Sequence, residues 1–571
     1  MGNIASIEPI LSPLIWTSIA TGKRPHKHGV LGFVEPDPLN GGIRSVGSRT
    51  RTGKALWNIL SEAGLRTHAV NWFASHPAES INGVCVSERF PLPVSPDPHH
   101  WPVSEGSVNP ASDAEILAGL RVHPREIEAS QIQPFVPRAA ELDQSDPKTQ
   151  ERLMAMARIL AETATVQSTA SWILENREWD FLAVYFQALD EFAHHFMPFH
   201  PPRIAGIDER EAEIFGSVME TAYSFHDLML GHLLAIAGED TTVILVSDHG
   251  FESGALRPGT VANQVATMAN WHRPFGVLAM AGEGIRSDER IYGASVLDIA
   301  PTILHLFGLP VGEDMDGKVL VAAMDSPQKV ERRDSWEDDE QGELPPAISL
   351  NVQEEQAMLN QWIALGYIEQ PKDSGKSMAE SAEQELRINR VTSLLHGGCL
   401  EQAESEARGL ATDFPSDRRM QLKLVQVLLS GGMLPEARER LDALDRELGA
   451  DFLTHRVRAN LLCLEGRPQE ALAILSQVIL LNDGRPEPFE QCGRIHLQLR
   501  HWSEAETCFR RALALEPDNP DALVGYSAAL ARQGKHEAAL EAVLRAVGLQ
   551  HFLPSGHFQL GAILSKMDAP E

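Results

Sequence analysis

Short, continuous runs of apolar residues alternate with helix-like stretches in the first part of the chain. The runs lie at 179–186, 241–248 and 275–282, and residues 55–60 follow a helical pattern. Apolar runs without polar alternation are typical of strands that helices bury on both faces, so the pattern predicts an α/β domain with a central, mainly parallel sheet. Residues 90–178 interrupt this pattern, and we interpret them as an inserted cap.

The pattern changes twice further along the chain. Residues 326–346 are rich in acidic residues and proline and poor in apolar ones, which indicates a linker or exposed arm. From about residue 380 the composition is dominated by Ala, Leu, Glu and Arg. We therefore predict an α/β domain at 1–325, an acidic linker with a connecting helix at 326–380, and an all-α domain at 381–571.

The all-α part contains an internal repeat. Alanine recurs every 34 residues, at Ala403, Ala437, Ala471, Ala505 and Ala539. The residues five positions earlier are Gly398, Gly432, Gly466, Arg500 and Gly534. Glycine permits the sharp turn between two helices of a repeat. The segment from roughly 384 to 550 resembles the tetratricopeptide repeat family, with residues 556–567 as a capping helix. The resemblance implies a solenoid whose groove binds another protein chain.

Charge and cysteine content narrow the classes of function. The 571 residues include 79 Asp and Glu against 49 Lys and Arg, for a net charge of −30. Such a surface repels a phosphate backbone, which disfavours nucleic-acid binding, and no apolar run approaches the roughly 20 residues that cross a bilayer. The five cysteines form no CxxC pair, which argues against a disulfide framework or a thiolate zinc site. These features favour a cytoplasmic protein.

Acidic and imidazole side chains flank the predicted strands. Asp190 and His194 follow the first run at a spacing of four, which places both on one face of a helical turn. Asp248 and His249 end the second run, and His272 precedes the third. Each cluster alone is also common as a solvated pair or a turn. Three clusters at strand ends favour a metal site, and mixed Asp and His ligands suit zinc, with manganese or iron as alternatives.

The segment at residues 12–22 supplies hydroxyl groups near the start of the chain. The pattern consists of Ser12, Thr21, Gly22, Pro25, His28 and Gly29, then the three clusters, then residues 297–304. Over about residues 1–320 it resembles the type I phosphodiesterase and nucleotide pyrophosphatase family of the alkaline phosphatase superfamily. The resemblance implies an alkaline-phosphatase-like sandwich that hydrolyses a phosphodiester or phosphoanhydride through a covalent phosphoserine.

The resemblance also assigns the site residues. Ser12 takes the position of the family's nucleophile. One divalent ion would be held by Asp190, His194 and His272, and a second by Asp248, His249 and the nucleophile oxygen. With two cations about 4 Å apart, such a site can neutralise a phosphoryl group and activate a serine hydroxyl.

This chain departs from the family pattern at two points. The family has an Asp-Gly turn several tens of residues before the nucleophile, whereas eleven residues precede Ser12 here. We therefore expect Met1 to be an internal methionine of a longer protein. Ile15 stands where many eukaryotic members have an asparagine that binds a phosphoryl oxygen. We expect the ions and the backbone amides near Ser12 to compensate, and nucleotide selectivity does not transfer.

Other interpretations differ in how well the residues support them. A sulfatase would need Pro and Arg two and four residues after the nucleophile, where this chain has Leu14 and Trp16. A phosphomonoesterase or a phospho-head-group transferase on the same scaffold stays open, because the scaffold does not fix the pocket. A catalytically impaired repeat scaffold is a further alternative. Pocket candidates, for which ordinary packing is the simpler role, are Trp72, His76, His99, His100 and Trp101.

Overall fold

The computed structural model describes most of the chain in two compact units. The described residues are 1–37, 42–143, 145–254, 257, 271–326, 328–337, 352–364, 367–368, 377–481, 484–550 and 553–567. The first unit comprises Met1, Pro9–Glu289 and Ser295–Glu383, and the second comprises Gly2–Glu8, Arg290–Ala294 and Gln384–Glu571. The predicted domain boundaries at 325 and 380 stay predictions. None of the described helices has the length and apolarity to cross a membrane.

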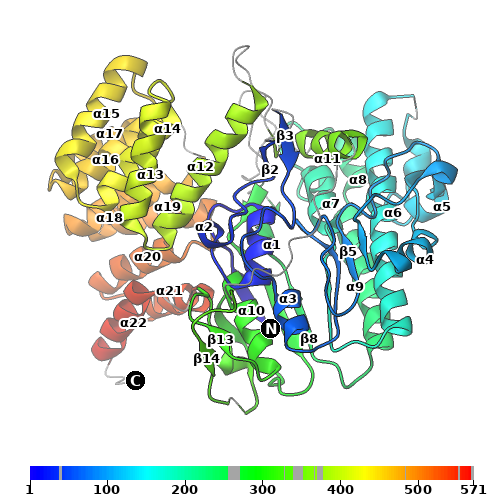
Figure 1. The fold of residues 1–571 in the computed structure, drawn as a ribbon. Coiled ribbons are helices and arrows are strands. Elements are labelled where there is room, and N and C mark those ends of the chain that lie inside the picture. The colour runs from blue at the N-terminus through cyan, green and yellow to red at the C-terminus, as the bar shows by residue number, and fades with distance from the viewer. Residues whose placement is uncertain are drawn as a thin grey trace. The chain divides into compact units, whose positions relative to one another are not determined.

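A four-stranded sheet with the order β6-β5-β4-β7 forms one part of the first unit. Its strand β5 is labelled in Figure 1. Strand β4 (Thr67–Trp72) pairs in parallel with β5 (Cys85–Ser87) and β7 (Phe181–Val184), and β6 (Val108–Asn109) is antiparallel to β5. Helix α6 (Pro147–Asn176) packs against this sheet through an apolar cluster that includes side chains of β4, β5 and α6. Residues 90–178, the predicted cap, thus contribute both a strand and a covering helix.

Two further strands come from the predicted apolar runs. Strand β8 (Val243–Val246) pairs with β11 (Phe275–Ala281) in antiparallel register, with Val246 opposite Leu278. The α/β class is confirmed, but the predicted parallel direction is wrong for this pair. Continuous apolar sequence reflects burial of both faces, and it does not encode the direction of the neighbouring strand.

The other elements of the first unit are shorter. Its remaining helices are α2 (Pro25–His28), α3 (Leu56–Glu62), α4 (Ala114–Ala118), α5 (Ala129–Ile132), α7 (Ala188–Phe196), α8 (Glu209–Phe215), α9 (Val218–Ala237), α10 (Ile299–Leu306) and α11 (Val352–Ala364). Short paired strands are β2 (Val34–Pro36) with β3 (Ile43–Ser45), β9 (Gly250–Phe251) with β10 (His272–Arg273), and β13 (Val311–Gly312) with β14 (Arg332–Arg333).

Several residues of the N-terminal motif have structural roles around helix α1 (Ser12–Thr21). It ends at Gly22, whose φ of 68° lies in the left-handed region, and the helix that follows ends at Gly29 with φ of 83°. Glycine adopts this conformation without a steric penalty. His28 is fully buried, and its Nε2 lies 2.9 Å from the Ser18 hydroxyl. These motif residues therefore shape the backbone around α1.

The described part of the predicted acidic linker is packed against the first unit. Strand β14 pairs in parallel with β13, and the Trp336 indole donates a hydrogen bond of 2.9 Å to the Pro310 carbonyl. Residues 328–337 are therefore attached to the first unit by a strand pair and one buried side chain, although half of them are exposed, and the linker interpretation stays a prediction. The average hydropathy of the segment is low, so it gave no sign that one buried residue, Trp336, holds the segment in place. The rest of the acidic segment, residues 338–346, lies outside the described residues, and α11 (Val352–Ala364) lies within the predicted linker and connecting helix at 326–380.

The second unit is built from helix pairs. Its helices are α12 (Met378–His396), α13 (Leu400–Asp413), α14 (Arg418–Ser430), α15 (Leu434–Leu448), α16 (Phe452–Leu464), α17 (Pro468–Leu481), α18 (Pro486–Gln498), α19 (Trp502–Leu515), α20 (Pro520–Arg532), α21 (His536–Leu549) and α22 (Pro554–Lys566). Two short strands, β1 (Gly2–Ala5) and β12 (Ile291–Ser295), are neighbours in a sheet. Helix α22 corresponds to the predicted capping helix.

The repeat prediction is confirmed in both of its elements. All five repeat alanines have an exposed fraction of 0%. The residues five positions earlier all have positive φ, at Gly398 (74°), Gly432 (72°), Gly466 (77°), Arg500 (61°) and Gly534 (79°). Arg500 thus adopts the backbone conformation that glycine provides in the other four repeats, although a side chain disfavours it.

Phe509 packs closely against two neighbouring helices of this unit. Its ring lies between two glycines, so that a Cβ atom added at Gly493 would lie 2.8 Å from the ring, and one at Gly525 would lie 2.2 Å from it. Both distances are shorter than any van der Waals contact. The absence of side chains at these two positions lets α18 and α20 enclose the fully buried ring.

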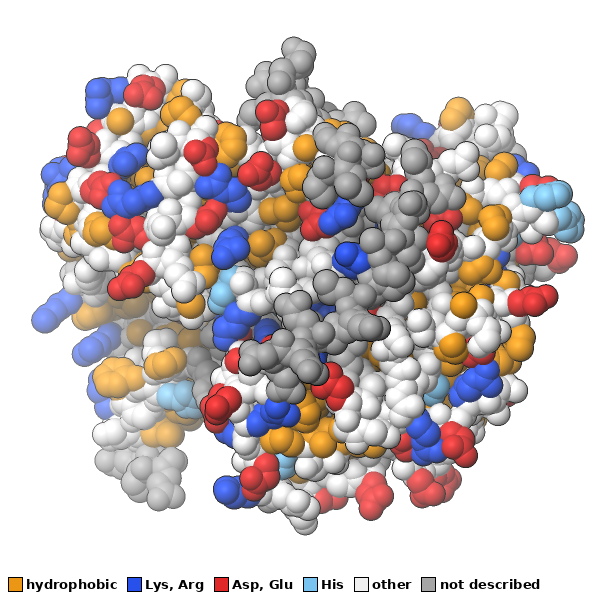
Figure 2. All heavy atoms as spheres, in the orientation of Figure 1, with side chains coloured by type: hydrophobic (Ala, Val, Ile, Leu, Met, Phe, Trp, Pro, Cys, Tyr) orange, Lys and Arg blue, Asp and Glu red, His pale blue; other side chains and the backbone are white. Residues whose placement is uncertain are grey.

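Charged side chains of both signs are interspersed on the molecular face that Figure 2 shows. On the repeat helices, many of them are joined in ion pairs, such as that of Arg408 with Glu436 at 2.6 Å and that of Arg458 with Asp445 at 2.6 Å. The net charge of −30 is therefore not gathered into a single acidic patch on this face.

Candidate metal centre and nucleophile

Helix α7 presents two of the predicted ligands. Asp190 and His194 lie on one face, as their spacing predicted, and Asp190 Oδ1 is 3.4 Å from His194 Nε2. The opposite face buries Phe192 and Phe196 completely in an aromatic core cluster. Because this apolar face fixes the rotation of α7, the carboxylate and the imidazole are held toward the loops that follow β8.

The turn after β8 orients Asp248 and His249. Gly250 lies so close to the Phe275 carbonyl that an added Cβ would be 2.5 Å from that oxygen. His249 Nδ1 is 2.9 Å from the Gly250 carbonyl oxygen, which accepts and cannot donate, so Nδ1 carries the proton. The lone pair of His249 therefore lies on Nε2, which is 3.9 Å from Asp190 Oδ1. This is the arrangement that metal-binding histidines use.

His272 reaches the same place from a paired strand. In the β9–β10 pair His272 lies opposite Phe251. Its Nδ1 faces the Ile10 carbonyl at 3.4 Å, and its Nε2 is 3.7 Å from Asp190 Oδ1. The ring stacks on that of His249 with centroids 3.8 Å apart. Pairing of β9 with β10 therefore brings together residues that are 23 positions apart in the printed sequence.

The gathered residues fit a divalent cation. Asp190, His249 and His272 each offer a ligand atom within 4.8 Å of the others. Asp190 Oδ1, Asp248 Oδ2 and His249 Nε2 are buried and have no hydrogen-bond partner among the described residues. Unpaired buried polar atoms are costly, and an ion would satisfy them. Since the resemblance places His249 at the second ion, the division of ligands between two ions stays a prediction.

Ser12 begins α1 beside this cluster. It is 5% exposed, and its hydroxyl is hydrogen-bonded to the Asp248 carboxylate. The amides of Leu14 and Ile15 donate to the Leu11 carbonyl, at 3.0 and 3.1 Å. These two amides are therefore engaged within the helix, and the expectation that backbone amides near Ser12 compensate for Ile15 stays a prediction. The positive end of the α1 dipole still favours negative charge at Ser12.

Burial and mutual attraction set the charges of the cluster. Burial on its own raises the pKa of Asp190, but His194, His249 and His272 hold it well below its usual range. Burial raises the pKa of Asp248. Burial and the charge of His249 lower the pKa of His272 to about 3. An ionised Asp190 and a neutral His272 are the protonation states that metal ligation requires.

Tyr367 is a site residue that the sequence did not reveal. Its hydroxyl donates to Asp190 Oδ2 at 2.9 Å and lies 2.7 Å from His194 Nε2. Its ring stacks on Phe33 with centroids 4.4 Å apart, and its backbone amide donates to the Trp362 carbonyl. Tyr367 lies 173 residues after His194, and no motif surrounds it, so sequence spacing carries no signal of this contact.

The predicted pocket candidates pack elsewhere or are exposed. Trp72 meets Trp16 edge to face at 5.1 Å, and His76 is buried with its Nδ1 3.1 Å from the Ser87 hydroxyl. Trp101 lies against the Arg121 guanidinium, 3.9 Å from its ring centroid. The other two candidates, His99 and His100, are exposed. Packing, the simpler role considered for these residues, accounts for the three that are not exposed.

The fold and the cluster together define an alkaline-phosphatase-like α/β domain joined to a helical repeat region. The chain belongs to the type I phosphodiesterase / nucleotide pyrophosphatase family, whose model matches residues 3–302. This family is metal-dependent. A tetratricopeptide repeat model matches residues 493–554. Both resemblances inferred from the sequence are confirmed.

Curated relatives match a smaller segment. A 2,3-bisphosphoglycerate-independent phosphoglycerate mutase of Thermomicrobium roseum is 34% identical over 99 residues, which cover 17% of this chain and 18% of the mutase. The enzyme of the same name from Prochlorococcus marinus is 33% identical over 121 residues, which cover 20% of this chain and 22% of that mutase. The chain therefore spans about a fifth of the length of these relatives.

Solved structures of repeat proteins match part of the chain. A thermophilic TPR protein of Thermus thermophilus covers 32% of this chain and 99% of its own, with 18% identity and a TM-score of 0.30. MamA of Desulfovibrio magneticus covers 27% of this chain and 86% of its own, with 20% identity and a TM-score of 0.25.

Proposed function

We propose that the first unit hydrolyses a phosphodiester or phosphoanhydride through a covalent phosphoserine at Ser12. One observation carries this proposal: the Ser12 hydroxyl is hydrogen-bonded to Asp248 beside the cluster of Asp190, His249 and His272. A hydroxyl, a carboxylate acceptor and a group of metal-type donors are the parts that phosphoryl transfer needs.

Each residue has a role in this proposal. Ser12 Oγ attacks phosphorus while the bond to the leaving oxygen breaks, and the Asp248 carboxylate accepts the hydrogen bond that orients the hydroxyl. The hydroxyl proton passes to solvent, and the leaving oxygen takes up a proton from water. Water then cleaves the phosphoserine bond and regenerates Ser12. The positive end of α1 favours the negative charge that develops beside Ser12.

Two divalent ions complete the proposed site. Asp190, His194 and His272 would hold one, and Asp248 and His249 the other. When bound, such ions neutralise phosphoryl charge and lower the pKa of a coordinated hydroxyl. The donor set suits zinc, with manganese or iron as alternatives. The tetratricopeptide repeats support binding of a protein partner, and we propose that this partner brings substrate to the first unit or localises it.

The proposal is tested by trapping the intermediate. The full chain, loaded with Zn²⁺ or Mn²⁺, is mixed with bis(p-nitrophenyl) phosphate, quenched in acid and digested for mass spectrometry. Since one p-nitrophenolate leaves, we expect a p-nitrophenyl phosphate ester on Ser12, and no labelled peptide and no turnover in Ser12→Ala. The exposed Ser130→Ala is the matched control and should behave as the parent. Turnover by Ser12→Ala at the parent rate would refute the nucleophile assignment.

Transfer of a phosphomonoester is a second candidate, which the similarity to phosphoglycerate mutases favours. The ratio of rates on bis(p-nitrophenyl) phosphate and p-nitrophenyl phosphate separates the two. A faster diester reaction supports the first proposal, and a faster monoester reaction supports the second. A metal-loaded chain that turns over neither ester would favour an impaired domain attached to a repeat scaffold.

A further inference from the structure

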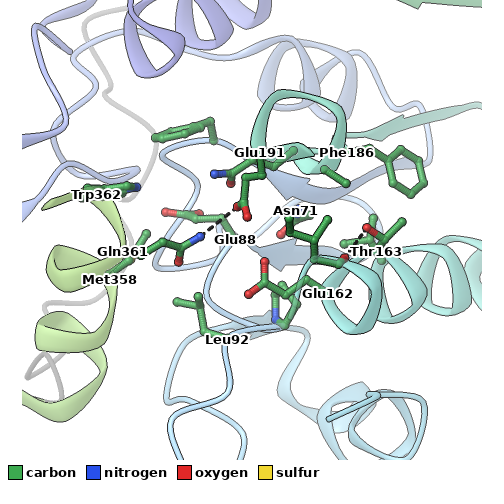
Figure 3. A pocket seen from close by; sticks show the side chains of 16 residues that line it. Asn71, Glu88, Leu92, Glu162, Thr163, Phe186, Glu191, Met358, Gln361 and Trp362 are labelled. Atoms are coloured by element: carbon green, nitrogen blue, oxygen red, sulfur yellow. Dashed lines mark hydrogen bonds between the residues drawn. The ribbon is translucent and has the colours of Figure 1, made fainter. Parts of the chain in front are cut away.

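A small cavity lies beside α7, apart from the metal-type cluster. Its volume is about 40 Å³, and it is enclosed by the end of β4, by α6, by α7 and by α11 (Figure 3). Glu191 lines it, whereas the preceding residue, Asp190, faces the histidines. A space of this size holds a group as large as one water molecule or one ammonium group.

The polar lining of the cavity is dominated by hydrogen-bond acceptors with negative charge. It includes Glu88, Glu162 and Glu191, and no Lys, Arg or His is among the sixteen described residues that line it. One guanidinium lies behind this wall: Arg158 Nη2 is 2.6 Å from Glu191 Oε2, and Nη1 is 3.2 Å from Glu162 Oε1. Arg158 thus serves two of the three carboxyl groups, and the charge of Arg89, which does not line the cavity, attracts the third, that of Glu88.

The excess of carboxyl groups over positive charges affects the protonation of two lining glutamates. Burial raises the pKa of Glu88, and burial raises that of Glu162 to about 7 despite the attraction of Arg158. A cation in the cavity would remove the electrostatic part of this penalty. The lining therefore favours a positively charged occupant over a neutral one.

Asn71 adds an independent acceptor. A bulge in the register of β4 and β5 falls between Val70 and Trp72, and Asn71 has a φ of 60° there, which turns its side chain out of the strand. Asn71 Nδ2 donates to the Tyr185 carbonyl at 3.1 Å, which fixes the amide orientation. Asn71 is 7% exposed and lines the cavity, and its Oδ1 has no hydrogen-bond partner among the described residues.

We propose that this cavity binds the primary ammonium group of a small amine. Asn71 Oδ1 and the Glu162 carboxylate accept N–H hydrogen bonds, and Glu88 and Glu191 contribute negative potential. In Figure 3 the polar ends of Asn71, Glu162 and Glu191 gather around one space.

The chemistry of the lining argues against a metal ion. Among the described residues, three glutamates of this lining do not bring ligand atoms within 4.8 Å of one another, as the Asp190 cluster does. The stacked rings of Phe73 and Trp362, with centroids 6.3 Å apart, form part of the wall and suit an organic cation. This proposal does not depend on the catalytic one.

The test uses the full chain and methylammonium chloride as the probe. Saturation-transfer NMR and calorimetry should show saturable binding above that seen in NaCl of equal ionic strength. Glu162→Gln keeps the shape but removes a charged acceptor, so binding should weaken roughly tenfold or more. Glu175→Gln, which changes an exposed residue on the same helix, should bind as the parent does.

A second variant keeps the proposal testable if Glu162→Gln does not fold. Asn71→Gly tolerates the positive φ and removes the Oδ1 acceptor, and it should also weaken binding. Thermal unfolding of each variant checks that it is folded. Absence of saturable binding by the parent overturns the proposal. The proposal is also overturned if K⁺ or tetramethylammonium binds as tightly as methylammonium does. It is likewise overturned if Glu162→Gln and Asn71→Gly both bind methylammonium with the affinity of the parent. Saturable binding of Mg²⁺ in place of methylammonium would identify a metal site instead.

Discussion

The Tyr367 hydroxyl lies 2.7 Å from His194 Nε2, a ring nitrogen that the proposed metal centre requires. The same hydroxyl donates to Asp190 Oδ2 at 2.9 Å. Because the hydroxyl has one proton and donates it to Asp190, His194 Nε2 carries its own proton in the short contact and has no lone pair for a cation. Contact with Tyr367 and binding of a divalent ion are therefore coupled through two side chains of α7.

Removing this hydroxyl should favour metal binding. Tyr367→Phe keeps the ring that stacks on Phe33 and abolishes both hydrogen bonds. Each such bond contributes about 0.5–1.5 kcal/mol, and the two together about 1–3 kcal/mol, so we expect the dissociation constant for Zn²⁺ to fall by roughly fivefold to 150-fold. Chelator competition measures this constant. The exposed Tyr223→Phe should leave it unchanged. Weaker binding by Tyr367→Phe would instead make the hydroxyl a ligand.

Metal loading should also stabilise the first unit. An ion that binds the folded state alone adds about 2.7 kcal/mol to the free energy of unfolding at 100 times its dissociation constant. We expect the unfolding temperature of the parent to rise with Zn²⁺ and to return to its starting value with a chelator. His272→Ala should abolish the rise, and the exposed His99→Ala should retain it. An equal rise in His272→Ala would remove His272 from the ligand set.

A buried ion pair fastens α11 to the first unit. Arg89 Nη2 is 2.5 Å from Glu355 Oε2, and both side chains are largely buried. Glu355→Ala leaves the guanidinium unpaired, which should lower the free energy of unfolding by about 3–5 kcal/mol in a denaturant titration. Gln356→Ala on the exposed face of α11 is the control.

The second part of this test replaces both charges. Because desolvation of an ion pair offsets much of its attraction, Arg89→Leu combined with Glu355→Leu should recover most of the loss. A double variant as unstable as Glu355→Ala would show that shape, and not the unpaired charge, causes the destabilisation.

His28 should make stability depend on pH. Burial, reinforced by the charge of Arg51, lowers the pKa of His28 to about 3, below the 6.5 of an unperturbed histidine. Between these values the unfolded chain binds a proton that the folded one does not, so stability falls as pH falls through this window. His28 contributes up to about 1.4 kcal/mol per pH unit.

His28→Asn tests this contribution, because its amide oxygen can accept the bond that His28 Nδ1 receives from the Val30 amide. The slope of unfolding free energy against pH, between about pH 6.5 and 4, should become shallower than in the parent. His99→Asn should keep the parent slope. An unchanged slope in His28→Asn would mean that other groups, among them the buried His76, dominate acid unfolding.

Arg500 offers a stabilising substitution. Its φ of 61° is the conformation that glycine adopts in the other repeats. Arg500→Gly should raise the free energy of unfolding of the second unit by about 1 kcal/mol, measured by denaturant titration. The reverse change, Gly466→Arg, should lower it by a similar amount. A loss of stability in Arg500→Gly would indicate that the arginine side chain makes contacts that outweigh the strain.

The sequence predicted features that depend on local spacing. The 34-residue period determined which alanines are buried, and the Asp190 to His194 spacing determined that both share a face of α7. Strand direction could not be predicted for β8 and β11, because an apolar run indicates that a strand is buried but not whether the strand beside it runs parallel or antiparallel. The contact of Tyr367 with His194 depends on how a segment 173 residues further along the chain packs at the site, and local sequence patterns do not predict such long-range packing.

The Phe509 ring limits how this unit can evolve. Gly493 and Gly525 come from separate helices, and either one replaced by alanine would place a methyl carbon within 2.8 Å of the aromatic ring, closer than van der Waals contact allows. A smaller residue at position 509 would have to precede any such change. Three positions spread over 33 residues of sequence therefore have to vary as a set, in a fixed order, although none of them belongs to the proposed catalytic site.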